Sequence, residues 1–154
     1  MLIFRRDRKA TVWTGVLPVW VGLILFSSTS LAGQVSDAAF TRFVATHIRR
    51  HDVFDLYHRW HVYFLAEKAV HITLFIVLAL LLWRLLPDIP GKVVVVFLCG
   101  ASLGCCSELV QSLFPDRDPA VRDVLINAVA TAIGAAAAFF YTRRQRRLAI
   151  RMLT

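Results

Sequence analysis

Seven polar residues whose side chains could bind an anion or move a proton occur in two short stretches of an otherwise apolar chain. They are Lys68, His71, Glu108, Gln111, Arg117, Asp123 and Asn127. A charge at the centre of a membrane helix costs roughly 2.5 to 3.5 kcal/mol, so charged groups retained there usually have a partner or a task. The cations could bind an anion, the carboxylates could orient those cations, and the amides could donate and accept hydrogen bonds. The alternative is an ion-paired cluster whose only role is to hold the helices together.

Helical spacing places six of these residues in pairs on three helix faces. The pairs are Lys68 with His71, Glu108 with Gln111, and Asp123 with Asn127. Pro115 breaks the helix between the last two pairs, and Arg117 follows it closely enough to fold back over both helix ends. We therefore expect the three pairs and Arg117 to converge at one end of a helical bundle.

The elements that must position these residues are membrane spans. The chain has 154 residues, of which 58% are hydrophobic, and a mean hydropathy of +0.62, which is too apolar for an ordinary soluble domain. Four apolar runs each approach the ~20 residues that a helix needs to cross the hydrocarbon core. They cover residues 11–31, 66–86, 93–114 and 124–141, and a basic tail follows at 143–154. The sequence therefore predicts one all-α domain over residues 1–154, a four-helix transmembrane bundle.

Basic residues predict the orientation of the bundle. Most of the 18 lysines and arginines fall near the two termini and the turn around residues 84–92, which predicts that both termini are cytoplasmic and the seven-residue cluster extracytoplasmic. The formal charge of +8 is explained by this topology and by anionic lipid, and a nucleic-acid partner is not expected. A cleavable signal peptide ending near Ala32 is the alternative for the first run, but the run is longer than a typical signal segment, which favours a retained anchor.

The segment between the first two apolar runs predicts an amphipathic helix at the membrane interface. Phe40, Phe43, Val44 and Ile48 repeat at helical spacing. The pairs His47 with His51 and His58 with His61 could present two imidazoles to a metal, but no further ligand is in register, so we expect interfacial histidines and no metal or cofactor. Cys99, Cys105 and Cys106 all lie within one apolar run and are interpreted as small packing residues.

The residues quoted above resemble the pattern of the VanZ-like family of small integral membrane proteins. That pattern has a lysine and histidine at the start of the second helix, and polar residues around the last outer turn with glycines behind them. The matching positions are Lys68, His71, Glu108, Gln111, Pro115, Arg117, Asp123, Asn127 and Gly134, with Ser27 and Ser28 near the end of the first helix. Glu67 stands where the family usually has aspartate, and Ala130 where a glycine is common.

The resemblance implies a multi-pass protein of the bacterial inner membrane. The family's namesake activity is resistance to glycopeptides, particularly teicoplanin, and no reaction is established for the fold. We expect the seven residues to bind a polar or anionic envelope ligand, such as the headgroup of a lipid-linked glycan or phosphate, with membrane lipids, a lipid-linked precursor or a glycopeptide as partners. Lys68, His71 and Arg117 would contact the anion, and Glu108 and Asp123 would orient those cations. The alternatives are a membrane enzyme acting on a polyprenyl-phosphate or glycan-linked substrate, for which no catalytic motif is recognised, and a purely structural protein.

Overall fold

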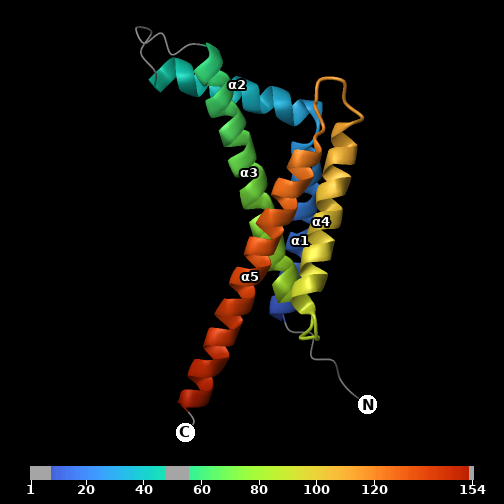
Figure 1. Ribbon diagram of the computed structural model, residues 1–154, viewed down its shortest axis with the longest axis vertical. Helices are drawn as coiled ribbons and strands as arrows, with labels where there is room; N and C mark the ends of the chain where they lie inside the picture. Colours follow the sequence, from blue (N-terminus) through green and yellow to red (C-terminus); the bar gives the residue numbers. More distant parts are fainter. Residues whose placement is uncertain (1–7, 48–55, 153–154) are drawn as a thin grey trace.

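The computed structural model describes residues 8–47 and 56–152 of the chain. This part consists of helices joined by short turns and contains no strand (Figure 1). Its helices are α1 (Arg8–Ser27), α2 (Ser30–His47), α3 (Leu56–Leu85), α4 (Lys92–Gln111) and α5 (Val121–Arg151). The helices α3, α4 and α5 are each long and apolar enough to cross a membrane, and the bent pair α1 and α2 gives a fourth candidate span if it is counted as one. The chain is therefore a helical membrane protein, as its composition predicts.

The first predicted span is broken near its C-terminal end. α1 ends at Ser27, four residues before the predicted boundary, and the axis turns by 77° before α2 continues the chain. The hydroxyls of Ser27 and Thr29 donate to backbone carbonyls one turn back, at 2.6 and 2.8 Å, and Thr29 Oγ1 also accepts from the backbone N–H of Ala32 at 3.4 Å. Such local bonds compete with the helical ladder and favour a helix end followed by a new N-cap. In Figure 1, α2 consequently lies across the end of the bundle instead of along it.

The predicted amphipathic segment after the first span is thus part of a helix that begins ten residues before Phe40. The stretch 48–55, which includes Ile48 and His51, lies outside the described residues. α2 carries Ser36 on its exposed surface, and the Ser36 hydroxyl lies 2.9 Å from the Tyr63 hydroxyl of α3. The Phe40 and Tyr63 rings also meet edge to face, with centroids 5.3 Å apart. These contacts fix α2 against the beginning of α3.

Small residues allow α5 to pack closely against α3 and α4. A Cβ on Gly134 of α5 would lie 2.8 Å from both the Ala79 Cβ and the Ile76 carbonyl oxygen of α3. Gly104 of α4 faces the Asn127 side chain of α5 in the same way, since a Cβ there would lie 3.2 Å from the Asn127 Cβ. Membrane helices associate largely through such close van der Waals contact. The small residues therefore hold together the helices that carry the polar cluster.

The apolar core lies below the polar cluster, along the middle of the bundle. Ile24 of α1, Phe75 and Leu78 of α3, and Ala130 of α5 are fully buried against one another. α1 is tied to α3 by the Trp20 indole N–H, which donates to the Leu74 carbonyl at 2.9 Å. The turn between α4 and α5 lies at the same end as the break between α1 and α2, whereas α1 begins and α5 ends at the opposite end (Figure 1).

The three cysteines of α4 do not contribute to this core. Cys99, Cys105 and Cys106 are free thiols on the exposed surface of the helix. They pack outward because the inward face of α4 is occupied by Gly100, Gly104 and the buried polar residues that follow. The three cysteines are therefore not packing residues in the interior of the bundle.

Candidate functional site

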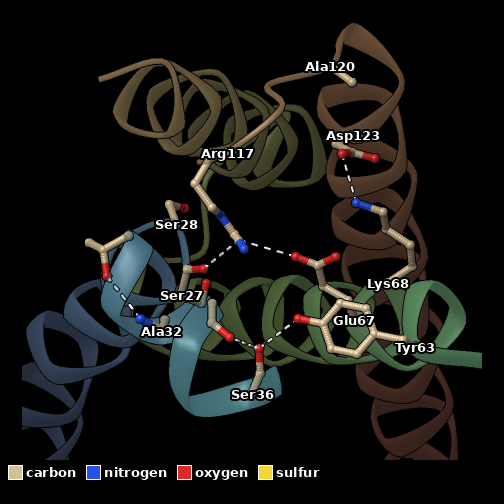
Figure 2. A network of polar contacts seen from close by, with 12 residues as sticks. Ser27, Ser28, Ala32, Ser36, Tyr63, Glu67, Lys68, Arg117, Ala120 and Asp123 are labelled. Atoms are coloured by element: carbon tan, nitrogen blue, oxygen red, sulfur yellow. Dashed lines mark hydrogen bonds and ion pairs between the residues drawn. The ribbon is translucent and has the colours of Figure 1, made fainter. Parts of the chain in front are cut away.

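Two ion pairs organise the polar end of the bundle (Figure 2). Lys68 of α3 donates to the Asp123 carboxylate of α5, with 2.7 Å between Nζ and Oδ2. Arg117, in the turn between α4 and α5, donates through Nη2 to the Glu67 carboxylate of α3 at 3.1 Å. Adjacent residues on α3 therefore point to different neighbours, because consecutive positions on a helix face different directions.

Arg117 also closes the break between α1 and α2. Its Nη2 donates to the Ser27 carbonyl at 3.1 Å, and this carbonyl belongs to the last turn of α1, where helical carbonyls lack a partner within the helix. The side chain passes directly beside Gly33 of α2, where a Cβ would lie 3.0 Å from Nη1. The Ser30 hydroxyl donates to the Asp116 carboxylate next to Arg117. One arginine thus connects the α4–α5 turn, the α1–α2 break and α3.

Glu108 has a different partner from the one that charge pairing predicts. Its Oε2 accepts a hydrogen bond from the backbone N–H of Ala120 at 3.1 Å, and Ala120 is the residue that precedes α5. In the described residues it forms no ion pair with Lys68 or Arg117. A carboxylate near a helix N-terminus satisfies an otherwise unpaired donor and interacts favourably with the helix dipole. Glu108 therefore couples the end of α4 to the start of α5.

Several buried polar atoms at this end have no hydrogen-bond partner among the described residues. They are Glu108 Oε1, Asp123 Oδ1, and both Nδ2 and Oδ1 of Asn127. Asn127 is only 1% exposed, and its amide lies between α5 and Gly104 of α4. Arg122 Nε approaches Asp123 Oδ1 to 3.5 Å, which is an ion pair without hydrogen-bond geometry. Buried polar groups are almost always satisfied, so these four atoms are exceptions at this end of the bundle.

A cavity of about 180 Å³ lies beside the Arg117–Glu67 pair. Arg117, Glu67 and the buried His71 supply its polar lining, and Phe40 and Tyr63 belong to its apolar wall. The cavity also touches Ser27, Gly33 and Ser36 on both sides of the α1–α2 break. It therefore combines a cation and an imidazole with apolar and aromatic surface, the composition of a site for an amphiphile.

The family model described as VanZ/LLP1 matches residues 13–142. The chain belongs to this family. No curated protein and no solved structure matches the chain. The VanZ/LLP1 match includes every residue of the two ion pairs and of the 180 Å³ cavity.

The VanZ/LLP1 fold brings the sequence-predicted residues together in two groups. Arg117 and His71 line the cavity, and the other five are at or near the junction of α3, α4 and α5. These five are Lys68, Glu108, Gln111, Asp123 and Asn127, of which all but Lys68 are buried. Asp123 forms an ion pair with Lys68, whereas Arg117 forms its ion pair with Glu67.

Glu67 and the Ser27 carbonyl are the site groups that sequence reasoning did not include. Glu67 precedes Lys68 at the start of a span and forms one polar group in the sequence with Lys68 and His71, but it is not among the seven residues predicted for the site. The charge of Glu67 and its position before a lysine at the start of a span could have marked it as a site residue, because a carboxylate at this depth requires a partner. The Ser27 carbonyl has no sequence signal, since backbone groups become binding partners only where a helix ends.

The structure gives no candidate metal ligands in the part of the chain that it describes. No group of three His, Cys, Asp or Glu side chains is close enough there to hold an ion. The histidine pairs of residues 47–61 lie mostly outside the side chains described, so the metal interpretation of that segment is not addressed.

Proposed function

We propose that this VanZ/LLP1 protein binds the polar head of an amphiphilic envelope ligand, such as a lipid-linked phosphate or glycan, at the end of the bundle that carries Arg117. The observation that supports the proposal most directly is the position of Arg117. Its side chain is 12% exposed and lines a cavity whose wall is otherwise largely apolar. A guanidinium in such a place can form paired hydrogen bonds to a phosphate or carboxylate.

The geometry leaves part of Arg117 available to a ligand. Both of its described hydrogen bonds, to Ser27 and Glu67, are made through Nη2. The donors on Nε and Nη1 have no hydrogen bond among the described residues, and Nη1 lies close to Gly33, where a side chain would crowd it. In this arrangement Glu67 and the Ser27 carbonyl hold the guanidinium, and its remaining edge contacts the anion. His71 offers a second polar contact from the floor of the same cavity.

The walls favour an amphiphile over a free ion. Phe40, Tyr63 and Val70 contribute apolar surface next to the arginine, and a chain attached to the phosphate could pass along them into the membrane. By the distribution of lysine and arginine, this end of the bundle is extracytoplasmic, where lipid-linked glycan precursors are used. A role in glycopeptide or teicoplanin resistance would follow if sequestering or presenting such a precursor changed access to the drug target.

An enzyme is the less favoured function. Its candidate acid or base residues are Glu108 and His71. Glu108 does not line the cavity and instead accepts from the Ala120 N–H, so of these two residues only His71 is placed to exchange a proton with a ligand there. Binding requires nothing beyond the contacts already described.

The test compares two ligands and two variants of the purified full chain. Farnesyl phosphate and farnesol, which share a chain and differ in the phosphate, are added and ligand retention is followed by native mass spectrometry. Arg117→Lys keeps the charge and loses the planar fork, so farnesyl phosphate retention should fall about tenfold or more, the value of one strong charge-assisted hydrogen bond. Arg122→Lys, an identical change beside Asp123 and outside the 180 Å³ cavity, is the matched control and should retain it.

Equal retention of farnesol and farnesyl phosphate would contradict the proposal, as would equal losses in the two variants. Release of inorganic phosphate from farnesyl phosphate would instead support the enzymatic alternative. Teicoplanin susceptibility of cells that express each variant then tests whether the ligand site and resistance are linked.

A further inference from the structure

A second and larger cavity lies at the opposite end of the bundle. It has a volume of about 560 Å³ and is lined by the end of α3, the turn before α4, and the distal half of α5. This volume is in the range of small-molecule sites. The family match ends at residue 142, so Arg143 and Arg146, which line the cavity, lie just beyond the matched part of the chain.

The cavity carries more positive than negative charge. Lys92, Arg143 and Arg146 line it together with a single carboxylate, Asp88. Arg146 contacts Asp88 directly, and Lys92 Nζ is 3.9 Å from the same carboxylate. Arg143 has no ion pair with any side chain that the structure describes. One carboxylate cannot neutralise three cations, so a positive potential remains in the cavity.

Lys92 is held in the cavity by contacts other than an ion pair. Its side chain is 11% exposed, its Nζ donates to the Leu86 carbonyl at 2.8 Å, and it lies 4.8 Å from the centroid of the Trp83 ring. A lysine fixed over an aromatic face loses little further conformational freedom when an anion binds. Its position is therefore suited to a phosphate.

The walls change from apolar to basic along α5. Phe139 comes first, then Thr142, then Arg143 and Arg146. The Trp83 indole N–H donates to the Thr142 hydroxyl at 3.1 Å, and the Trp83 and Phe139 rings meet edge to face at 6.3 Å. Aromatic residues followed by arginines are characteristic of the boundary between hydrocarbon and headgroups.

The length of α5 supports this placement. Its 31 residues extend roughly 46 Å at 1.5 Å per residue, which exceeds the ~30 Å hydrocarbon core. The basic end of α5 therefore continues beyond the membrane core, and the cavity is at headgroup level.

We propose that this cavity binds the phosphate headgroup of an anionic phospholipid from the leaflet on the side of the chain termini. Arg143 and Lys92 contact the phosphate, and Trp83 and Phe139 contact the glycerol and the first methylenes. A free phosphate ester shares the anionic chemistry, but it would not use the aromatic wall. The site is separate from the Arg117 cavity, and the two proposals do not depend on each other.

The experiment measures lipid retention by native mass spectrometry of the purified full chain in an equimolar mixture of dioleoyl phosphatidylglycerol and dioleoyl phosphatidylcholine. The wild type should retain phosphatidylglycerol preferentially. Arg143→Gln should reduce that preference about tenfold, as expected for one charge-assisted contact, and Arg143→Lys should restore most of it. The matched control is Arg147→Gln, which removes the same charge from the same basic helix end outside the cavity.

Any of the following three results would overturn the proposal. Equal losses in Arg143→Gln and Arg147→Gln would show diffuse attraction to the basic end of α5. The absence of any preference in the wild type would show that the cavity does not select anionic lipid. Displacement of phosphatidylglycerol by glycerol 3-phosphate at similar concentration would show that the cavity recognises a free phosphate ester and not a lipid. Circular dichroism melts of each variant confirm that retention is compared among folded proteins.

Discussion

Glu108 illustrates how a buried carboxylate can serve the backbone instead of a neighbouring cation. Its Oε2 accepts from the Ala120 N–H at the start of α5, and Oε1 has no described partner. A neutral amide could make the same contact through its oxygen, whereas a methyl group could not. Replacing Glu108 by glutamine or by alanine therefore distinguishes the contribution of its hydrogen bond from the contribution of its negative charge.

We predict that Glu108→Ala destabilises the bundle by about 1 to 3 kcal/mol, because it leaves the Ala120 N–H without its acceptor, and that Glu108→Gln costs less than about half as much. Unfolding of the purified protein in detergent measures both. Leu109→Ala, on the exposed face of the same helix, is the control for truncation alone. If Glu108→Gln is as destabilising as Glu108→Ala, the negative charge and not the acceptor is what the fold requires.

At the scale of the elements, the contact between α3 and α5 depends on Gly134. The atoms that a Cβ there would meet are the Ala79 Cβ and the backbone of Ile76, neither of which can rotate away. Gly22 of α1 is also helical, but a Cβ there would meet nothing within 4 Å. Replacing each of the two glycines by alanine therefore separates the effect of helix propensity from the effect of helix packing.

Gly134→Ala should destabilise the bundle by about 1 to 3 kcal/mol through overpacking, although alanine is the better helix former. Gly22→Ala should be neutral or stabilising by up to about 1 kcal/mol. Thermal unfolding in one detergent gives both values. Equal effects at the two positions would mean that α3 and α5 can separate without cost, and that the close approach is not what holds Lys68 near Asp123.

At the scale of the whole molecule, the two cavities lie at opposite ends of the bundle. The α4–α5 turn and the α1–α2 break are at one end, and the basic end of α5 is at the other (Figure 1). The two ends must therefore be on different sides of the membrane if α3, α4 and α5 all cross it. The distribution of lysine and arginine predicts that the Arg117 end is outside the cell.

A cysteine introduced at Asp118 should accordingly be labelled in intact cells by an impermeant thiol reagent, and one introduced at Gln145 should be labelled only after the membrane is opened. Both positions are exposed. Cys99, Cys105 and Cys106 are exposed as well, so they are replaced first. The reverse labelling pattern would put the Arg117 cavity in the cytoplasm and remove the argument for an extracytoplasmic ligand.

The sequence by itself determined the class of protein, its helical nature and the family. Hydropathy and length predict spans because a bilayer requires paired backbone groups over a fixed thickness, and the run from Glu108 to Asn127 has a spacing that few other folds would need. The three pairs of polar residues could also be assigned to helix faces, since helical periodicity is a local property.

Only the tertiary structure decided which hydrogen-bond and ion-pair partners these polar side chains have. Arg117 pairs with Glu67 and the Ser27 carbonyl, and Glu108 accepts from Ala120, because these contacts depend on the 77° bend after α1 and on the close packing of α5 permitted by Gly134. Charge alone could have paired Glu108 with Arg117 equally well. The cavity among Trp83, Lys92 and Arg143 likewise has no local motif, since its lining comes from the end of one helix, a turn and the far half of another, and only folding brings these together.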